Sequence, residues 1–181
     1  MTVTKTIVVV FILIITCNLA KAQSGLASIS MSVPRAIFLA LADPSPGIES
    51  VSGEPAKGHL RIRLTQPANG NALRFSLLAR SNTAYDLTAR LSPSASQLRV
   101  RPGGVEAYSG TALVMPDALS VRFEPASVVS AVTDVPIARG PRISKAGNQS
   151  TANNAVVLTF YVEMPEELKD AELILQMNPD L

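Results

Sequence analysis

Apolar and charged residues alternate one by one in His59-Leu60-Arg61-Ile62-Arg63-Leu64. Successive side chains of an extended chain point to opposite faces, so the three apolar residues share one face and the two arginines share the other. This period of two is typical of a strand with one face in a core and one face in water. The same pattern predicts strands at residues 72–78, 85–91, 98–101, 121–123, 156–162 and 173–177.

Turn residues separate these predicted strands. Ser81-Asn82-Thr83-Ala84 is predicted to close a hairpin, because asparagine tolerates left-handed backbone and strong alternation flanks it on both sides. Pro102-Gly103-Gly104 is predicted to be a turn. Pro34 separates two further candidate strands, 27–33 and 36–41, which favours an edge strand that bends or switches sheets.

Helical periodicity is confined to a single possible turn at residues 165–170, and residues 140–154 are predicted to form a loop. Many short strands between turn signals are typical of a sandwich or a barrel. A single open sheet would leave one apolar face in water, so two packed layers are favoured. We therefore predict an all-β fold, a single immunoglobulin-like antiparallel β-sandwich of about seven to nine strands.

The N-terminus has the three parts of a secretory signal peptide. Lys5 precedes the apolar run 7–15, and the small-residue site Ala20-Lys21-Ala22 follows it. The run is shorter than the ~20 residues that span a bilayer. We predict a signal peptide at residues 1–22, cleavage between Ala22 and Gln23, and one β-sandwich domain at residues 23–181.

Two alternatives for the leader stay open: a retained membrane anchor, and lipid attachment at Cys17, which ends the apolar run. Thr16 precedes Cys17 where lipid processing usually requires a smaller residue, so cleavage is favoured. Cys17 is the chain's one cysteine, and an exported domain without it has no disulfide. This favours a bacterial protein, exported to the periplasm or to the cell surface.

Charge is unevenly distributed along the chain. The net charge of +2 includes Lys5 and Lys21, so removal of the leader makes the domain neutral and no attraction to nucleic acid is expected. If the alternation holds, seven arginines point away from the core and form what we call the arginine face. Its members are Arg61, Arg63, Arg74, Arg90, Arg99, Arg101 and Arg122.

A C-terminal acidic segment is the candidate counterpart of the arginine face. Its members are Glu163, Glu166, Glu167, Asp170 and Glu172. The segment could dock on the arginine face of the same chain, or on that of a neighbouring copy in a contact that propagates. The intramolecular version is preferred, because a final core strand explains the alternation of residues 173–177 more simply.

Catalytic chemistry is not expected. His59 is the one histidine, it stands at a predicted strand start, and no G-x-S-x-G motif occurs. We expect no catalytic residue, no metal site and no cofactor, because the ligand clusters that zinc and calcium require are missing from the sequence. A hydrolase that uses Glu163, Glu166 and Glu167, with Tyr108 as an exposed ring, is kept as a third hypothesis.

The sequence thus leads to two main hypotheses. The first is a non-catalytic exported structural or protein-interaction module of the bacterial envelope, whose partner is an envelope protein or another copy of itself. The alternative is a binder of an anionic glycan or of lipid headgroups through the arginine face, with binding that weakens as salt screens the charges. The mature form is not expected to span the membrane.

Overall fold

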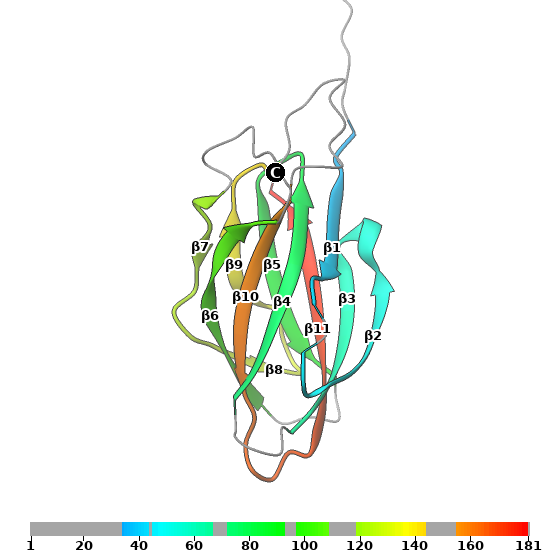
Figure 1. Cartoon of the computed structure of the whole chain (residues 1–181), viewed down its shortest axis with the longest axis vertical. Helices are drawn as coiled ribbons and strands as arrows, with labels where there is room; N and C mark the ends of the chain where they lie inside the picture. Colours follow the sequence, from blue (N-terminus) through cyan, green and yellow to red (C-terminus); the bar gives the residue numbers. More distant parts are fainter. Residues whose placement is uncertain are drawn as a thin grey trace, which may run out of the picture. The chain divides into compact units, whose positions relative to one another are not determined.

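The structure, a computed structural model, describes residues 34–43, 45–66, 72–92, 97–108, 119–143 and 155–180. The predicted signal peptide, its cleavage at Ala22 and Gln23, Cys17 and the candidate strand 27–33 lie outside the described residues. Two antiparallel sheets, which we call sheet A and sheet B, pack face to face (Figure 1). Within the described residues no helix has the length and apolar character needed to cross a bilayer.

In the described part of the chain, sheet A has five strands in the order β1-β4-β10-β6-β8, and all neighbours are antiparallel. Strand β10 occupies the centre, with β4 on one side and β6 on the other. The strands are β1 (Ile37–Leu41), β4 (Ala72–Ser81), β10 (Val156–Glu163), β6 (Gln97–Ala107) and β8 (Ser127–Ser130).

Sheet B has six strands among the described residues, in the order β2-β3-β11-β5-β9-β7, again antiparallel throughout. The C-terminal strand β11 lies inside the sheet, paired with β3 and with β5. The strands are β2 (Ile48–Glu54), β3 (His59–Thr65), β11 (Asp170–Pro179), β5 (Tyr85–Leu91), β9 (Val135–Gly140) and β7 (Arg122–Phe123), and the 3-10 turn η2 (Pro55–Lys57) joins β2 to β3.

The core forms between the inner faces of the two sheets. Along β3, Leu60, Ile62 and Leu64 are buried and the arginines between them are exposed, as the alternation predicts. Phe160 stacks on Phe75 with ring centroids 5.5 Å apart. The predicted all-β, immunoglobulin-like sandwich is confirmed, although the described residues contain eleven strands rather than about seven to nine.

The predicted hairpin at residues 81–84 is wrong, because β4 belongs to sheet A and β5 to sheet B. Asn82 anchors the start of β1 instead. Its Nδ2 donates to the Pro34 carbonyl at 2.8 Å, and its Oδ1 accepts the Ala36 N–H at 2.8 Å. The segment therefore crosses between the layers while its asparagine side chain ties down a neighbouring strand.

The predicted turn at residues 102–104 is also wrong, because these residues lie inside β6. The register with β10 shifts here: Thr159 faces Gly104, and Phe160 faces Pro102. Gly103 is thus the extra residue of a β-bulge, a feature that glycine favours. Further along, where the sequence allows a single helical turn, residues 166–167 form a turn closed by the Leu168 N–H, which donates to the Pro165 carbonyl at 3.0 Å.

Candidate functional site

The seven arginines of the predicted arginine face are all exposed, but they do not share a face. Arg74, Arg99 and Arg101 lie on sheet A. The other four, Arg61, Arg63, Arg90 and Arg122, lie on sheet B. The prediction of one arginine face is therefore wrong, because alternation within a strand says which side faces water but not to which sheet the strand belongs.

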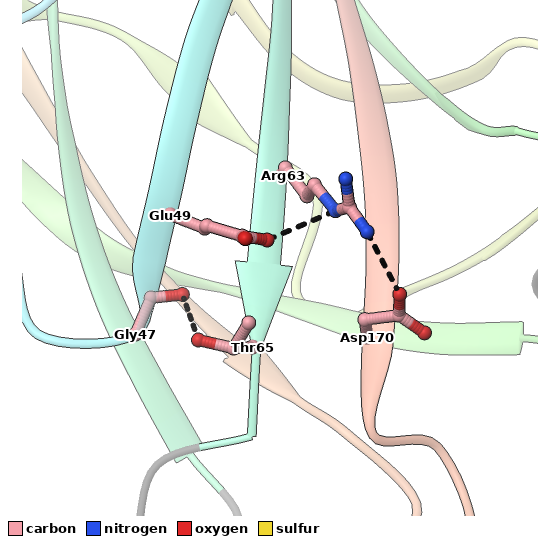
Figure 2. Close-up of polar contacts among 5 residues, drawn as sticks. All are labelled: Gly47, Glu49, Arg63, Thr65 and Asp170. Atoms are coloured by element: carbon pink, nitrogen blue, oxygen red, sulfur yellow. Dashed lines mark hydrogen bonds and ion pairs between the residues drawn. The ribbon is translucent and has the colours of Figure 1, made fainter.

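On sheet B the arginines are paired within the chain. Arg63 lies between two carboxylates, with its Nε 2.9 Å from Glu49 Oε2 and its Nη2 3.3 Å from Asp170 Oδ2 (Figure 2). Beside it, the Thr65 hydroxyl donates to the Gly47 carbonyl at 3.4 Å, which helps to fix the start of β2. The remaining pairs are Arg61 with Glu172 at 3.4 Å, Arg90 with Asp134 at 3.6 Å, and Arg139 with Asp86 at 3.1 Å.

On sheet A one glutamate serves two arginines. Arg101 Nε lies 2.7 Å from Glu163 Oε1, and Arg99 Nη1 lies 4.0 Å from Glu163 Oε2. Glu163, Asp170 and Glu172 thus contact arginines of their own chain. Glu166 and Glu167 are exposed in the turn after β10 and form no ion pair with a described residue.

The charge balance differs between the two sheets. The strands of sheet B carry five arginines and five carboxylates, whereas those of sheet A carry four arginines against two glutamates. Arg80 covers the Phe38 ring at 5.5 Å from its centroid. Arg74 forms no ion pair with any residue in the described ranges, and on sheet B the same is true of Arg122. The excess positive charge of the sandwich therefore lies on the outer face of sheet A.

A hollow of about 180 Å³ opens on this outer face at the bulge of β6. A Cβ on Gly103 would come within 2.8 Å of Thr159 Cγ2 and 2.9 Å of Tyr161 Cε2, so a side chain does not fit there. We call this the Gly103 hollow. It is lined by Arg74, Gly103, Gly104, Val105, Glu106, Thr159 and Tyr161.

Tyr161 is the residue of this hollow that sequence reasoning missed. It faces outward, is 37% exposed, and lies in register with Arg74 on one side and Arg101 on the other. Sequence reasoning had singled out Tyr108 as an exposed ring, which is also correct, since Tyr108 is 41% exposed. The alternation along β10 could have identified Tyr161, because it falls between the inward-facing Phe160 and Val162 and must face outward.

A larger hollow of about 560 Å³ does not support the hydrolase hypothesis. Glu163 lines it, but Glu166, Glu167 and Tyr108 do not. Tyr108 donates its N–H to the Ala155 carbonyl at 3.1 Å, at the far end of β10. At roughly 3.3 Å per residue, Glu163 lies on the order of 26 Å away along the same strand. The acids and Tyr108 share no concave site.

The outer edge of sheet B is the third candidate site. Among the described residues, strand β2 pairs with β3 alone and lies at the edge of the sheet (Figure 1). Six of its seven residues are exposed. Val51 is in register with the buried Ile62 and so faces the inner side of the sheet, yet it is 41% exposed. Sheet A ends at β1, which pairs with β4 and otherwise contacts η2, β11 and β3 rather than β2. One strand of sheet B therefore overhangs the sandwich.

Charge protects the end of this overhanging strand. Lys57 Nζ lies 2.8 Å from Glu54 Oε2, and this hydrogen bond together with the positive charge lowers the pKa of Glu54. Gly53 in the same strand has a φ of 126° and comes within 2.5 Å of the His59 carbonyl oxygen if given a Cβ, so glycine is required. The edge thus combines an ordered backbone with charges at its end.

In the described ranges no group of three His, Cys, Asp or Glu side chains could hold a metal ion. Comparison of the chain with family models, with curated proteins and with solved structures finds no match.

Proposed function

We propose that this chain is a non-catalytic exported structural or protein-interaction module of the bacterial envelope, and that it associates through the free edge of β2. The observation that carries the proposal is the exposure of Val51, an inward-facing apolar residue on a strand that overhangs the sandwich. Its export rests on the leader sequence.

A free strand edge is a natural binding surface for another extended segment. Its outer N–H and C=O groups have no partner in the sheet, so a strand from a second polypeptide can extend the sheet and satisfy them. Val51 adds apolar surface that such a strand would cover, at about 25 cal/mol per Å² of buried apolar area. Hydrogen bonds between the backbones would supply the affinity, and the Val51 side chain would set the register of the added strand.

The same edge carries features that limit indiscriminate pairing. The register between β2 and β3 shifts between Ile48 and Ser50, and Glu49 and Glu54 place carboxylates along the strand. Bulges and charges are the usual means by which proteins protect an edge. These features favour a partner of complementary charge over general aggregation.

The proposal is tested by light scattering after size-exclusion chromatography, over a range of concentrations and at low and high salt. The wild-type protein is compared with Val51→Lys, because an inward-pointing charge blocks strand addition. The control is Val132→Lys, the same change at a valine that is 85% exposed between β8 and β9. Each variant is also used, with cross-linking, to capture partners from envelope extract.

We expect the wild type and Val132→Lys to form the same dimer or partner complex, and Val51→Lys to form neither. A wild-type protein that is strictly monomeric and captures nothing would contradict the module hypothesis. Association that Val51→Lys leaves unchanged would retain an interaction module but remove the β2 edge as its binding site.

A second candidate function, binding of an anionic glycan or of lipid headgroups, is supported by the excess arginine on the outer face of sheet A. The arginines proposed to bind are those of sheet A and not the whole predicted arginine face, since most arginines of sheet B are neutralised by carboxylates of their own chain. Binding through exposed guanidinium groups should weaken as salt rises, with screening over ~8 Å at physiological ionic strength. Retention on an acidic polysaccharide column that does not change with salt would contradict it.

A further inference from the structure

We propose that the Gly103 hollow binds one acidic sugar residue of an anionic glycan, with the sugar carboxylate held by Arg74. The inference rests on the second candidate function and gives it a site and a ligand class.

The open room of the hollow comes from the missing side chain at Gly104. Gly103 and Gly104 stand between Arg101 and Glu106 on β6, where neighbouring positions carry long side chains. A Cβ on Gly104 would meet nothing within 4 Å, so the backbone there opens outward and a ligand can approach it closely. The volume of about 180 Å³ holds about six water molecules at ~30 Å³ each, which matches a small, single-ring ligand.

The positive charge of Arg74 favours a ligand that carries an acid group. Arg74 lines the hollow, is exposed, and has no ion-pair partner within the described part of the chain. Arg101, in contrast, is held by Glu163 at 2.7 Å. A guanidinium group binds a carboxylate through two parallel hydrogen bonds, so Arg74 is the residue available to a new anion.

The remaining lining selects a sugar over a small inorganic anion. Glu106 lies in the same hollow and repels any anionic group, but a uronic acid can place hydroxyl groups against this carboxylate and its own carboxylate against Arg74, whereas a phosphate ion carries its charge on all sides. Thr159 directs its methyl group at Gly103, while its hydroxyl lies 3.1 Å from that of Ser76. Tyr161 adds a partly exposed ring whose apolar body can cover the face of a pyranose. A ligand with one carboxylate, several hydroxyls and an apolar ring face matches Arg74, Glu106 and Tyr161.

The test is a titration, by NMR and calorimetry, of the mature protein with trigalacturonate, at low and at physiological salt. Neutral galactotriose, inorganic phosphate and vesicles of zwitterionic and anionic lipid are separate arms. The variants are Arg74→Gln and Tyr161→Leu, and the matched control is Arg122→Gln, an exposed arginine of sheet B without an ion pair to a described residue. Thermal unfolding of each variant checks that the fold is kept.

We expect trigalacturonate to bind, to shift resonances of Thr159 and Tyr161, and to lose about tenfold in affinity with Arg74→Gln, while Arg122→Gln changes it by less than about twofold. Equal losses in the two arginine variants, or binding of galactotriose, phosphate or vesicles as tight as that of trigalacturonate, would overturn the assigned site and ligand. Retention on other acidic polysaccharides would then keep the second candidate function, and no binding to any polyanion would remove both.

Discussion

Tyr85 places a phenol hydroxyl inside the sandwich, where its oxygen has no hydrogen-bond partner among the described residues. The side chain is 1% exposed and faces the core from the start of β5. An unpaired buried hydroxyl costs about 1–3 kcal/mol. We therefore expect Tyr85→Phe to raise the free energy of unfolding by about 1 kcal/mol in urea. Tyr161→Phe, at an exposed ring, is the control and should change little; a destabilised Tyr85→Phe would show that the hydroxyl is satisfied.

The same tyrosine makes stability depend on alkaline pH. Burial raises the pKa of Tyr85 in the folded state, so above the ordinary tyrosine pKa of about 10 the unfolded chain loses a proton that the folded chain retains. Below about pH 10 the phenol is neutral in both states and this effect is absent. As the pH rises further, the unfolded chain ionises first and the free energy of unfolding decreases. The wild type should lose stability faster than Tyr85→Phe between neutral pH and about pH 11, measured by urea unfolding at each pH. Parallel curves for the two proteins would contradict this.

Gly140 packs its backbone against the Tyr85 ring. A Cβ at this position would overlap ring atoms of Tyr85, the residue in register with it across β5 and β9. We expect Gly140→Ala to destabilise the fold by about 1–3 kcal/mol. The loss should shrink in a Tyr85→Leu background, which removes the overlapping atoms. A double-mutant cycle measures this coupling, and additive losses would mean that the ring does not cause the strain.

At the scale of single elements, β3 allows the contributions of a buried face and an exposed face to stability to be compared. Ile62 is fully buried and Arg63 is exposed between two carboxylates. Ile62→Ala should cost about 2–5 kcal/mol because it leaves a cavity in the core. Arg63→Gln should cost less than about 1 kcal/mol, and less still in high salt, because exposed ion pairs are weak. Denaturant unfolding of both variants checks the contrast, and comparable losses would contradict it.

Strands with a regular alternation were predictable from sequence, the edge strands β1 and β7 included, whereas β2, β8 and β9 were not. Apolar and charged residues alternate along β3 because its inner residues pack against sheet A, and six residues are enough to show the alternation. β2 was missed because six of its seven residues are exposed, so no apolar period marks it. Gly103 was read as part of a turn because glycine and proline also mark turns, and only the pairing of β6 with β10 shows a bulge.

At the scale of the whole molecule, sequence reasoning fixed which side chains face water but not how the strands divide between two sheets. The segment 81–84 lies between two well-predicted strands, yet those strands pair with distant partners. That long-range pairing separates Arg74 from Arg90 and brings Arg74 beside Tyr161. The candidate sites depend on these contacts, which local periodicity does not encode.

Export is a prediction about the whole chain. Expressed in full in a Gram-negative bacterium, the protein should appear in the periplasmic or surface fraction with Gln23 as its first residue. Mass spectrometry of the purified protein measures the N-terminus directly. A lipid-modified Cys17 or an uncleaved leader would show instead that one of the two alternatives for the leader is correct.

Amide hydrogen exchange, followed residue by residue, tests the central claim most directly: a sandwich whose free β2 edge receives a strand. In the monomer, amides of β11 should exchange slowest, because β3 and β5 flank it. Amides of β2 that point away from β3 should exchange rapidly. On association, protection should rise in β2 and not in the strands of sheet A. Protection of β2 equal to that of β11 in the monomer, or no change in β2 on association, would contradict the account.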